Sequence, residues 1–584
     1  MLVTRAHRYS KKASATSKIN RIIYESSFRI ILCSVCSRDL LLFPSETHST
    51  GGVFHVEIIV PLANQALPSF RHKGTTIETK GLACFFHVLA AIRYAKRRTE
   101  AMFSVSEKQQ VCQLFFVQVV LIVLMGALMT YGPEADANSL KNHGQTGDHG
   151  RKQVKKPDTD PLRVYPMYQD VHVMIWIGFG FLMTFLRRYG QSAIGLTFLL
   201  GAILIQVAMI CEGVTNIDKN NASYLSLKSL LSADVAVATP LISMGALLGK
   251  TTYMQLVFMG ILELIMFTVN KYVGEHLLMV VDAGDSMFVH AFGAYFGLAV
   301  SFVFGTKDKP KEHNLEGPSY NSDIFAMIGT VFLWLFWPSF NSAALQGDDQ
   351  QRAIINTLLS ISSSCVIAFA TSALVSKDSK FNMVHVQNST LAGGVAIGTA
   401  AGMMCKPVGA LVVGALAGLL SVLGYKYLTP LIQKRLKIHD TCGVHNLHGM
   451  PGVLGGIFGA LMAGLATEAS YDYSLYEIFP ARAPNSEAKL AEMRDNYGIS
   501  AGFNRTAGEQ AGYQLLVLVI TVGIAIVSGL VTGLMMRMSI CGSISEEQKF
   551  DDEANWELEE EASLESKIKE GNSYGGDQLP MAHI

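Results

Sequence analysis

The chain has 584 residues with 47 basic and 47 acidic side chains, and half of its residues are hydrophobic while 16% are charged. A typical soluble protein has about a quarter of its residues charged, so this chain is too apolar for that class. The formal net charge of zero is the sum of three different regions. Residues 1–101 carry 15 Lys/Arg and 6 Asp/Glu, residues 541–584 carry 3 Lys/Arg and 12 Asp/Glu, and the residues between carry 29 of each. This composition excludes disorder, collagen-like structure and a nucleic-acid-binding core.

Residues 1–101 form a basic N-terminal extension that lacks the periodicity of a domain. Its first 24 residues contain no acid and are rich in Arg, Lys and Ser, as in a mitochondrial transit peptide, but they show no processing site. Cys33 and Cys36 form a CxxC pair with no second pair nearby, which does not indicate a zinc or redox site. We expect translation to begin at or near Met102, and the extension to be a gene-model artefact or disordered.

Twelve apolar spans follow, of about the length that crosses ~30 Å of hydrocarbon at ~1.5 Å per residue. They lie near residues 111–131, 171–187, 192–212, 233–249, 254–273, 287–305, 323–344, 353–375, 386–404, 408–428, 443–465 and 513–537. Gly, Asn, Thr and Pro interrupt several spans, which predicts helices packed in a bundle, because freed backbone groups must be satisfied by neighbouring protein. Small residues at helical spacing, such as Gly452, Gly456 and Ala460, predict faces on which helices approach closely.

The loops predict the orientation of these spans. If the first span runs from inside to outside, the inner loops carry clustered basic residues such as Arg187, Arg188 and Lys250, as the positive-inside rule requires, although the long outer loop at 132–170 is also basic. The glycosylation sequons at Asn221 and Asn504 both fall in loops that this orientation places outside. We therefore expect a multi-pass membrane protein with both termini in the cytoplasm.

Two segments share a pattern that points to a site within the membrane. In each, an aspartate precedes a histidine by eight residues and a glycine follows the histidine by seven: Asp282 with His290, and Asp440 with His448. Eight helical residues advance ~12 Å, so we expect each Asp at a membrane face and each His about half a bilayer away. The two spans run in opposite directions, and the histidines are expected to meet near the midplane, as at the interface of inverted repeats.

An ionisable side chain within a membrane indicates a functional site when it faces a cavity or a partner. The alternative is a pair of unrelated core histidines, each bonded to backbone. His445 has no counterpart in the first segment and is interpreted as supporting. No nucleophile with a base, metal-ligand cluster or phosphate-binding loop stands in a credible context, so we expect no enzyme, no cofactor and no metal site.

Residues 541–584 end the chain as an acidic segment without apolar periodicity, and are interpreted as a flexible cytoplasmic tail. The predicted organisation is therefore an extension at 1–101, a membrane domain at 102–540 and the tail at 541–584.

Five long stretches resemble the Rhesus (Rh) glycoproteins, the animal branch of the ammonium transporter family. They are YPMYQDVHVMIWIGFGFLMTFLRRYG, VVDAGDSMFVHAFGAYFGL, FAMIGTVFLWLFWPSFNSA, MVHVQNSTLAGGVAIGTAAGMM and DTCGVHNLHGMPGVLGGIFGA. The resemblance covers nearly everything from about Met102 to Met538. It implies an all-α polytopic fold, a homotrimer of twelve-helix subunits in the plasma membrane, each with a pore between two inverted pseudo-symmetric five-helix halves.

The resemblance also implies roles for single residues. His290 and His448 match the paired pore histidines of the family. Asp282 matches the acidic residue at the outer end of the pore helix, and Asp440 its inner counterpart. We expect both, with Asp234, to support helix ends; the alternative is that Asp282 and Asp440 carry protons. Phe340, in WPSFNSA, matches one of two stacked phenylalanines that close the outer vestibule. The position of the other, after Asp234 of the fourth span, holds Val235. A double phenylalanine gate is therefore not expected, and a wider constriction or gating by Phe340 alone are the alternatives.

The function predicted is an ammonium/ammonia channel that conducts neutral ammonia, because moving a bare cation through an apolar pore costs many kcal/mol. A carbon dioxide channel is the alternative within transport. The alternative from another class is a membrane structural or sensing protein whose tails bind a cytoskeletal partner. The aromatic residues of 332–337 are interpreted as packing, except Trp337, which adjoins Phe340 and the proposed gate.

Overall fold

The computed structural model of the chain describes residues 28–31, 41–44, 57–59, 107–132, 135–137, 161–216, 223–304 and 313–558. Contacts divide the chain into two units, Met1–Arg98 and Thr99–Ile584. Within the first unit, the described residues form three short strands, β1 (Phe28–Ile31), β2 (Leu41–Pro44) and β3 (Glu57–Ile59), in the order β2-β1-β3. The CxxC pair and the rest of the predicted extension lie outside the described residues.

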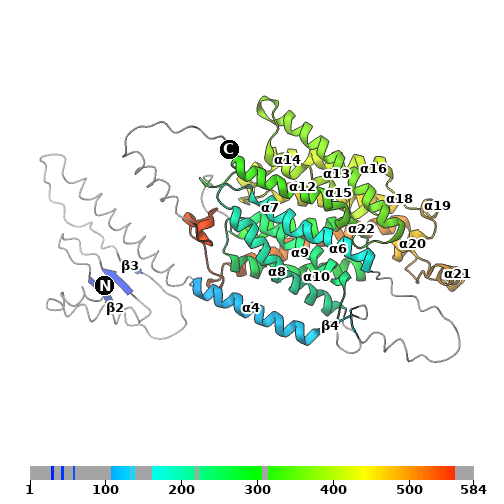
Figure 1. Ribbon diagram of the computed structural model, residues 1–584, viewed down its shortest axis with the longest axis horizontal. Coiled ribbons are helices and arrows are strands. Elements are labelled where there is room, and N and C mark those ends of the chain that lie inside the picture. Colours follow the sequence, from blue (N-terminus) through cyan, green and yellow to red (C-terminus); the bar gives the residue numbers. More distant parts are fainter. Residues whose placement is uncertain are drawn as a thin grey trace, which may run out of the picture. The chain divides into compact units, whose positions relative to one another are not determined.

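Among the described residues of the second unit, ten main helices pack side by side as a bundle (Figure 1), and one of them, α11, continues the π turn at Ser286–Ala291. They are α4 (Glu107–Leu128), α8 (Gly190–Thr215), α9 (Leu227–Leu247), α10 (Tyr253–Tyr272), α11 (Phe292–Phe304), α12 (Tyr320–Ser342), α13 (Gly347–Val375), α16 (Lys406–Leu423), α18 (Met450–Leu465) and α22 (Ala507–Met536). Shorter helices are α6 (Pro161–Val173), α7 (Gly180–Leu182), α14 (Met383–Ser389), α15 (Ala392–Ile397), α17 (Thr429–Leu436), α19 (Glu468–Tyr471), α20 (Ser474–Ile478) and α21 (Glu487–Tyr497). Two further strands, β4 (Met129–Tyr131) and β5 (Ser223–Leu225), pair in parallel.

Several helix junctions are π-helical or 3₁₀ turns rather than loops. The π turns are η1 (Met174–Phe179), η3 (Val273–Leu277), η4 (Ser286–Ala291), η7 (Gly424–Leu428) and η8 (His445–Gly449). The 3₁₀ turns include η2 (Met183–Phe185) and η6 (Gly398–Ala400). Such turns let one continuous span change direction or aim a side chain without leaving the bundle.

In the part of the chain that the structure describes, ten helices are long and apolar enough to cross a membrane. The predicted spans at 171–187 and 386–404 are the two not among them. The first contains the π turn η1 and the 3₁₀ turn η2 next to α6 and α7, and the second is broken into α14, α15 and η6. Close packing accompanies the breaks. A Cβ on Gly394 of α15, for example, would lie 2.7 Å from ring atoms of Trp337. The interrupted backbone is buried in protein, which is where a membrane protein tolerates it.

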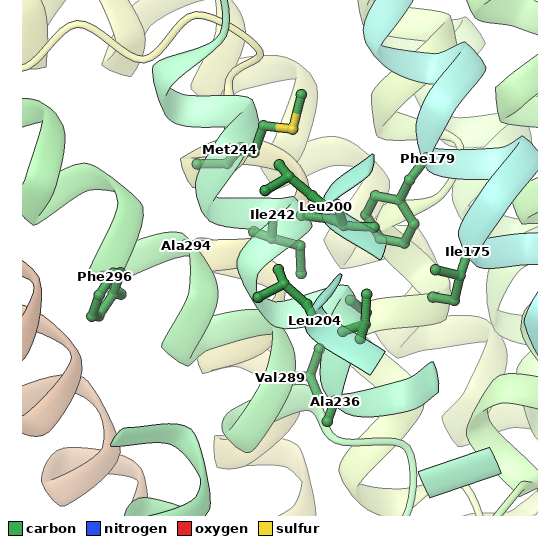
Figure 2. Close-up of a cluster of buried hydrophobic side chains, with 14 of the residues drawn as sticks. Ile175, Phe179, Leu200, Leu204, Ala236, Ile242, Met244, Val289, Ala294 and Phe296 are labelled. Carbon is green, nitrogen blue, oxygen red and sulfur yellow. The ribbon is translucent and has the colours of Figure 1, made fainter. Parts of the chain in front are cut away.

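The core lies between η1, α8, α9 and the turn η4. Figure 2 shows Phe179, Leu200, Leu204, Ile242 and Val289 among the side chains of this cluster. Burial of these large apolar groups fixes the four elements against each other, and so sets the position of the histidine that η4 carries.

The end of the described chain packs on the bundle instead of forming a free tail. The Asp552 carboxylate accepts hydrogen bonds from the backbone N–H groups of Gln191 (3.0 Å) and Ser192 (2.6 Å) at the start of α8. Trp556 donates to the Ser192 hydroxyl, and the Phe550 ring is buried. The prediction of a flexible tail from residue 541 is therefore wrong for residues 541–558, because its few apolar residues and one capping aspartate are enough to dock it. Residues 559–584 lie outside the described part of the chain.

Candidate functional site

The two predicted histidines meet inside the bundle. Their Nδ1 atoms are 3.1 Å apart, the ring centroids are 5.2 Å apart, and the ring planes differ by 7°. His290 is fully buried and His448 is 4% exposed. Each histidine lies in a π turn, η4 or η8, that leads directly into a long helix, α11 or α18. Two matching sequence segments thus contribute one ring each to a single contact.

This contact constrains the protons that the pair can carry. A hydrogen bond between two Nδ1 atoms needs one N–H and one lone pair, which two neutral imidazoles of opposite tautomer supply. Two imidazolium rings would place N–H against N–H. The Nε2 atom of His290 is buried without a hydrogen-bond partner among the described residues. The arrangement therefore leaves a ring nitrogen available to a small polar molecule.

Asp282 and Asp440 lie before the histidine-bearing turns and accept hydrogen bonds from their backbones. Asp282 Oδ2 accepts from the N–H groups of Met287 (2.8 Å) and Phe288 (2.9 Å), and its Oδ1 accepts from the Thr399 hydroxyl at 2.5 Å. Asp440 accepts from the N–H groups of three consecutive residues, 443–445, at 2.9 to 3.0 Å. A carboxylate that satisfies the free N–H groups of a first helical turn holds that turn in place.

The prediction that each Asp and its His lie on one helix, eight residues apart, is wrong. The π turns begin at Ser286 and His445, so neither aspartate is inside a helix and the histidines are only four and three residues from the first helical residue. The residues between Asp and helix form tight turns, in which Asp285 and Gly443 have positive φ. The eight-residue interval is therefore a capping arrangement, and it does not measure depth in the membrane.

Aromatic rings lie against both sides of the histidine pair. The ring centroids of Phe340 and Trp337, both on α12, are 5.6 Å from that of His290, and the Trp337 ring is nearly parallel to it. On the other side, the Phe179 ring lies 6.2 Å from His448 at 15°. Phe340 and Trp337 were singled out from the sequence. Phe179, which lies in η1 within the predicted span at 171–187, was not.

Val235 and Asp234 lie on α9 and are both buried, at 7% and 1% exposure. Asp234 Oδ2 lies 2.9 Å from Nδ1 of His172 on α6. His172 was not predicted as a site residue, although a histidine within an apolar segment was the available signal. The structure thus brings Asp234 to a histidine other than the central pair.

Beyond His448 the bundle contains a small, mainly apolar cavity of about 30 Å³. Among its lining residues are Phe179, Leu241, Ile242, Val444 and His448. A cavity of this size holds about one water molecule, and its apolar walls cannot replace the hydration shell of an ion. Passage of a small neutral molecule is chemically compatible with these walls, whereas passage of a bare cation is costly.

The remaining predicted residues lie away from this centre. His445 packs edge-on against the Tyr295 ring, with 5.9 Å between centroids. Asn504 is exposed in the segment before α22, and Asn221 lies outside the described residues. Among the described residues, no group of three or more His, Cys, Asp or Glu side chains could hold a metal ion.

Comparison with known proteins gives evidence on the family of this chain that does not depend on the geometry of the site. The model of the Ammonium Transporter Family matches residues 150–561. The chain is 43% identical over 469 residues to the ammonium transporter Rh type B of Oryzias latipes, covering 80% of this chain and 96% of the relative. It is 45% identical over 412 residues to the mouse protein of that type, covering 70% and 87%.

Solved structures agree with this result. Rh50 from Nitrosomonas europaea, a channel of the Rhesus protein family, is 30% identical in sequence, and its structure matches with a TM-score of 0.55. The match covers 71% of this chain and 98% of Rh50. A sensor Amt protein, 18% identical and with a TM-score of 0.54, shares the fold.

Proposed function

This chain belongs to the ammonium transporter family, in its Rhesus branch, and from that premise we propose that it is a channel that conducts neutral ammonia past His290 and His448. The observation that carries the proposal is the 3.1 Å contact between the two Nδ1 atoms in a fully buried setting. Each ring then carries one proton: one ring places it between the two Nδ1 atoms, and the other carries it on Nε2. Both imidazoles are neutral, so the pair offers hydrogen bonds to ammonia without the field that would hold an anion or repel a cation.

The proposed route has three steps. Ammonium reaches the outer mouth and gives up its proton to water there. Ammonia then passes Phe340, exchanges hydrogen bonds with the free ring nitrogens of the histidine pair, and crosses the apolar cavity beyond His448. On the far side it takes a proton from water. Only the neutral molecule crosses the apolar section, which avoids the desolvation cost of an ion.

The same premise supports a proposed assembly and orientation. We propose twelve spans, counting the two broken ones, in two inverted halves that each contribute one π turn and one histidine. The subunit is proposed to form a homotrimer in the plasma membrane with both termini cytoplasmic. Asn504, exposed before α22 on the proposed outer face, is the described candidate for glycosylation. The basic residues Arg187, Arg188 and Lys250 then face the cytoplasm.

Replacement of His290 by Ala tests the function. In proteoliposomes given an external ammonium pulse, we expect the variant to lose most of the protein-dependent rise in internal pH, because ammonia meets no polar partner at the narrowest point. His385→Ala is the matched control, since His385 is also buried but bonds Ser372 on α13. An unchanged rate in a correctly folded His290→Ala protein would overturn the proposal.

The same variant separates ammonia from carbon dioxide. Carbon dioxide has no N–H group for the histidine nitrogens to accept from, and removal of a ring widens the passage. We expect the His290→Ala protein to keep any carbon dioxide permeability that the unmodified chain has, measured as acidification during a carbon dioxide pulse. Parallel loss of both gas responses would argue against a specific role of the imidazoles.

A further inference from the structure

A second, larger cavity of about 250 Å³ lies where α8, α9 and α10 end or begin, on the face that the proposed orientation places outside. Its wall includes Ala233 and Ala236, which flank the Asp234–Val235 pair, and Ala344, four residues beyond Phe340. The cavity therefore borders α9, which carries Val235, and the turn directly after α12, which carries Phe340.

Lys271, on α10, and Glu275 both line this cavity, and the Lys271 ammonium lies between Glu275 and Asp285, which is not itself a lining residue. Its Nζ lies 3.0 and 3.3 Å from the two carboxylate oxygens of Asp285 and 3.6 Å from Oε1 of Glu275. The same Nζ lies 5.8 Å from the centroid of the Phe267 ring. Asp285 is nearly buried, with 8% of its side chain exposed, while Lys271 and Glu275 are 30% and 36% exposed.

Carboxylate oxygens together with an aromatic face are the groups that recognise a free ammonium ion. Here they surround an ammonium group that is attached to the protein. Glu212 lines the same cavity, which gives three carboxylates near one lysine. The cavity is thus a cation-binding environment whose cation position is already filled by Lys271.

We infer that Lys271 sets the affinity of the outer mouth for ammonium, acting as a tethered competitor for the position between Asp285 and Glu275. The inference rests on the proposed function, because it concerns delivery of ammonium to the same pore. Lys271 keeps external ammonium weakly bound, so that uptake saturates only at high concentration. Removal of its charge leaves the carboxylates free to hold an ammonium or methylammonium ion from solution.

The test is Lys271→Met, which removes the charge and keeps an unbranched side chain of similar length. Uptake of labelled methylammonium into cells that express the variant should saturate at an external concentration roughly three- to tenfold lower than for the unmodified chain, the size expected for one partly screened charge at a few ångströms. Lys271→Met combined with Glu275→Gln should return the half-saturating concentration toward the original value, since one carboxylate charge is removed with the cation.

Lys406→Met is the matched control, because Lys406 is an exposed lysine at the start of α16, on the same proposed face but outside the cavity wall. Calorimetric titration of the purified proteins with methylammonium gives a readout independent of flux, and should show tighter binding by Lys271→Met. Equal half-saturation and equal binding for Lys271→Met and Lys406→Met would overturn the inference. Failure of the proposed function is a different result: uptake by the unmodified chain would not exceed that of cells without it.

Discussion

At the residue scale, Asp282 links the histidine-bearing turn η4 to a distant part of the chain. Its carboxylate accepts two backbone N–H groups of η4 and the hydroxyl of Thr399 in η6, and it is 6% exposed. His290 follows two residues after the second of these N–H groups. The aspartate therefore holds the turn that aims one ring of the histidine pair.

We predict that Asp282→Ala destabilises the protein by roughly 3 kcal/mol, because hydrogen bonds to a charged acceptor contribute about 1.5–3 kcal/mol each and the buried donors are left unpaired. Thermal unfolding in detergent measures the change. Thr399→Val is the graded control, which removes one of the three bonds and should cost roughly 1–2 kcal/mol. Equal stability of the Asp282→Ala protein and the unmodified chain would show that the turn does not depend on this carboxylate.

The repeated Asp and His pattern allowed the central pair to be predicted at this scale, since both members share a local sequence. The partners of Asp234 and Lys271 could not be predicted in the same way. His172 is 62 residues from Asp234, and the loop residue Asp285 meets Lys271 only because α10 and the start of η4 converge. Contacts of this kind depend on the packing of elements that the sequence order does not bring together.

At the element scale, α18 approaches the turn η4 at Gly452. A Cβ on this glycine would lie 2.6 Å from the carbonyl oxygen of Ser286 and 2.9 Å from the backbone nitrogen of Ala291. Backbone atoms cannot move aside as a flexible side chain can. Gly452 was predicted to lie on a close-packed face, and its position one helical turn after His448 makes that face part of the support of the site.

Gly452→Ala should therefore cost about 1–3 kcal/mol of stability, as overpacking does, and should lower ammonia flux because η4 and η8 are pushed apart. Gly523→Ala on α22 is the matched control, since no heavy atom outside its own helix lies within 4 Å of the added Cβ. That control should be neutral or slightly more stable, by up to about 1 kcal/mol. A Gly452→Ala protein with the stability and flux of the control would contradict this assignment of the contact.

The long helices were predicted from the length of apolar runs, and ten helices in the described chain are long and apolar enough to cross a membrane. The spans at 171–187 and 386–404 show the limit of that signal. Interruptions were expected in several spans, but hydropathy did not locate the π and 3₁₀ turns that divide these two where rings and backbones pack. The docked segment at 541–558 was missed for a related reason: its acidic composition hides a few apolar contacts and one helix-capping aspartate.

At the scale of the whole molecule, Lys250 joins three segments on the proposed cytoplasmic face. Its Nζ donates to the carbonyl oxygens of Ala246 (2.7 Å) and His439 (2.5 Å), and lies 3.4 Å from the Ser301 hydroxyl. These residues belong to α9, α11 and the loop before η8. Burial lowers the pKa of Lys250 to about 8, although the charges of Asp440 and Glu316 act in the opposite direction.

This pKa predicts a pH dependence of stability. The unfolded lysine has a pKa of about 10.4, so between pH 8 and that value the unfolded chain binds more protons than the folded chain, and the free energy of unfolding rises with pH. Below pH 8 both states are protonated and the cost of burying the charge is fully present. Unfolding temperatures at pH 7.5 and 10 should show the unmodified chain gaining stability relative to Lys250→Met as pH rises. A constant difference, or a relative loss, would contradict the pKa assigned to Lys250.

Two of the three charge regions of the sequence contribute residues to the described part of the second unit. The balanced middle contains the histidine pair and the apolar cavity, where a passage for a neutral molecule needs no strong field of either sign. The acidic end supplies Asp552, which caps α8.

Membership of the ammonium transporter family was predicted from five sequence stretches and is confirmed by the family match and the Rh type B relatives.

The most direct test of the central claim is to record internal pH and membrane current together in proteoliposomes during an inward ammonium gradient. The account predicts a rise in internal pH without protein-dependent current, since neutral ammonia enters and takes up a proton inside, and it predicts that His290→Ala removes most of this rise. A current that carries one positive charge for each nitrogen taken up, with no rise in internal pH, would contradict it.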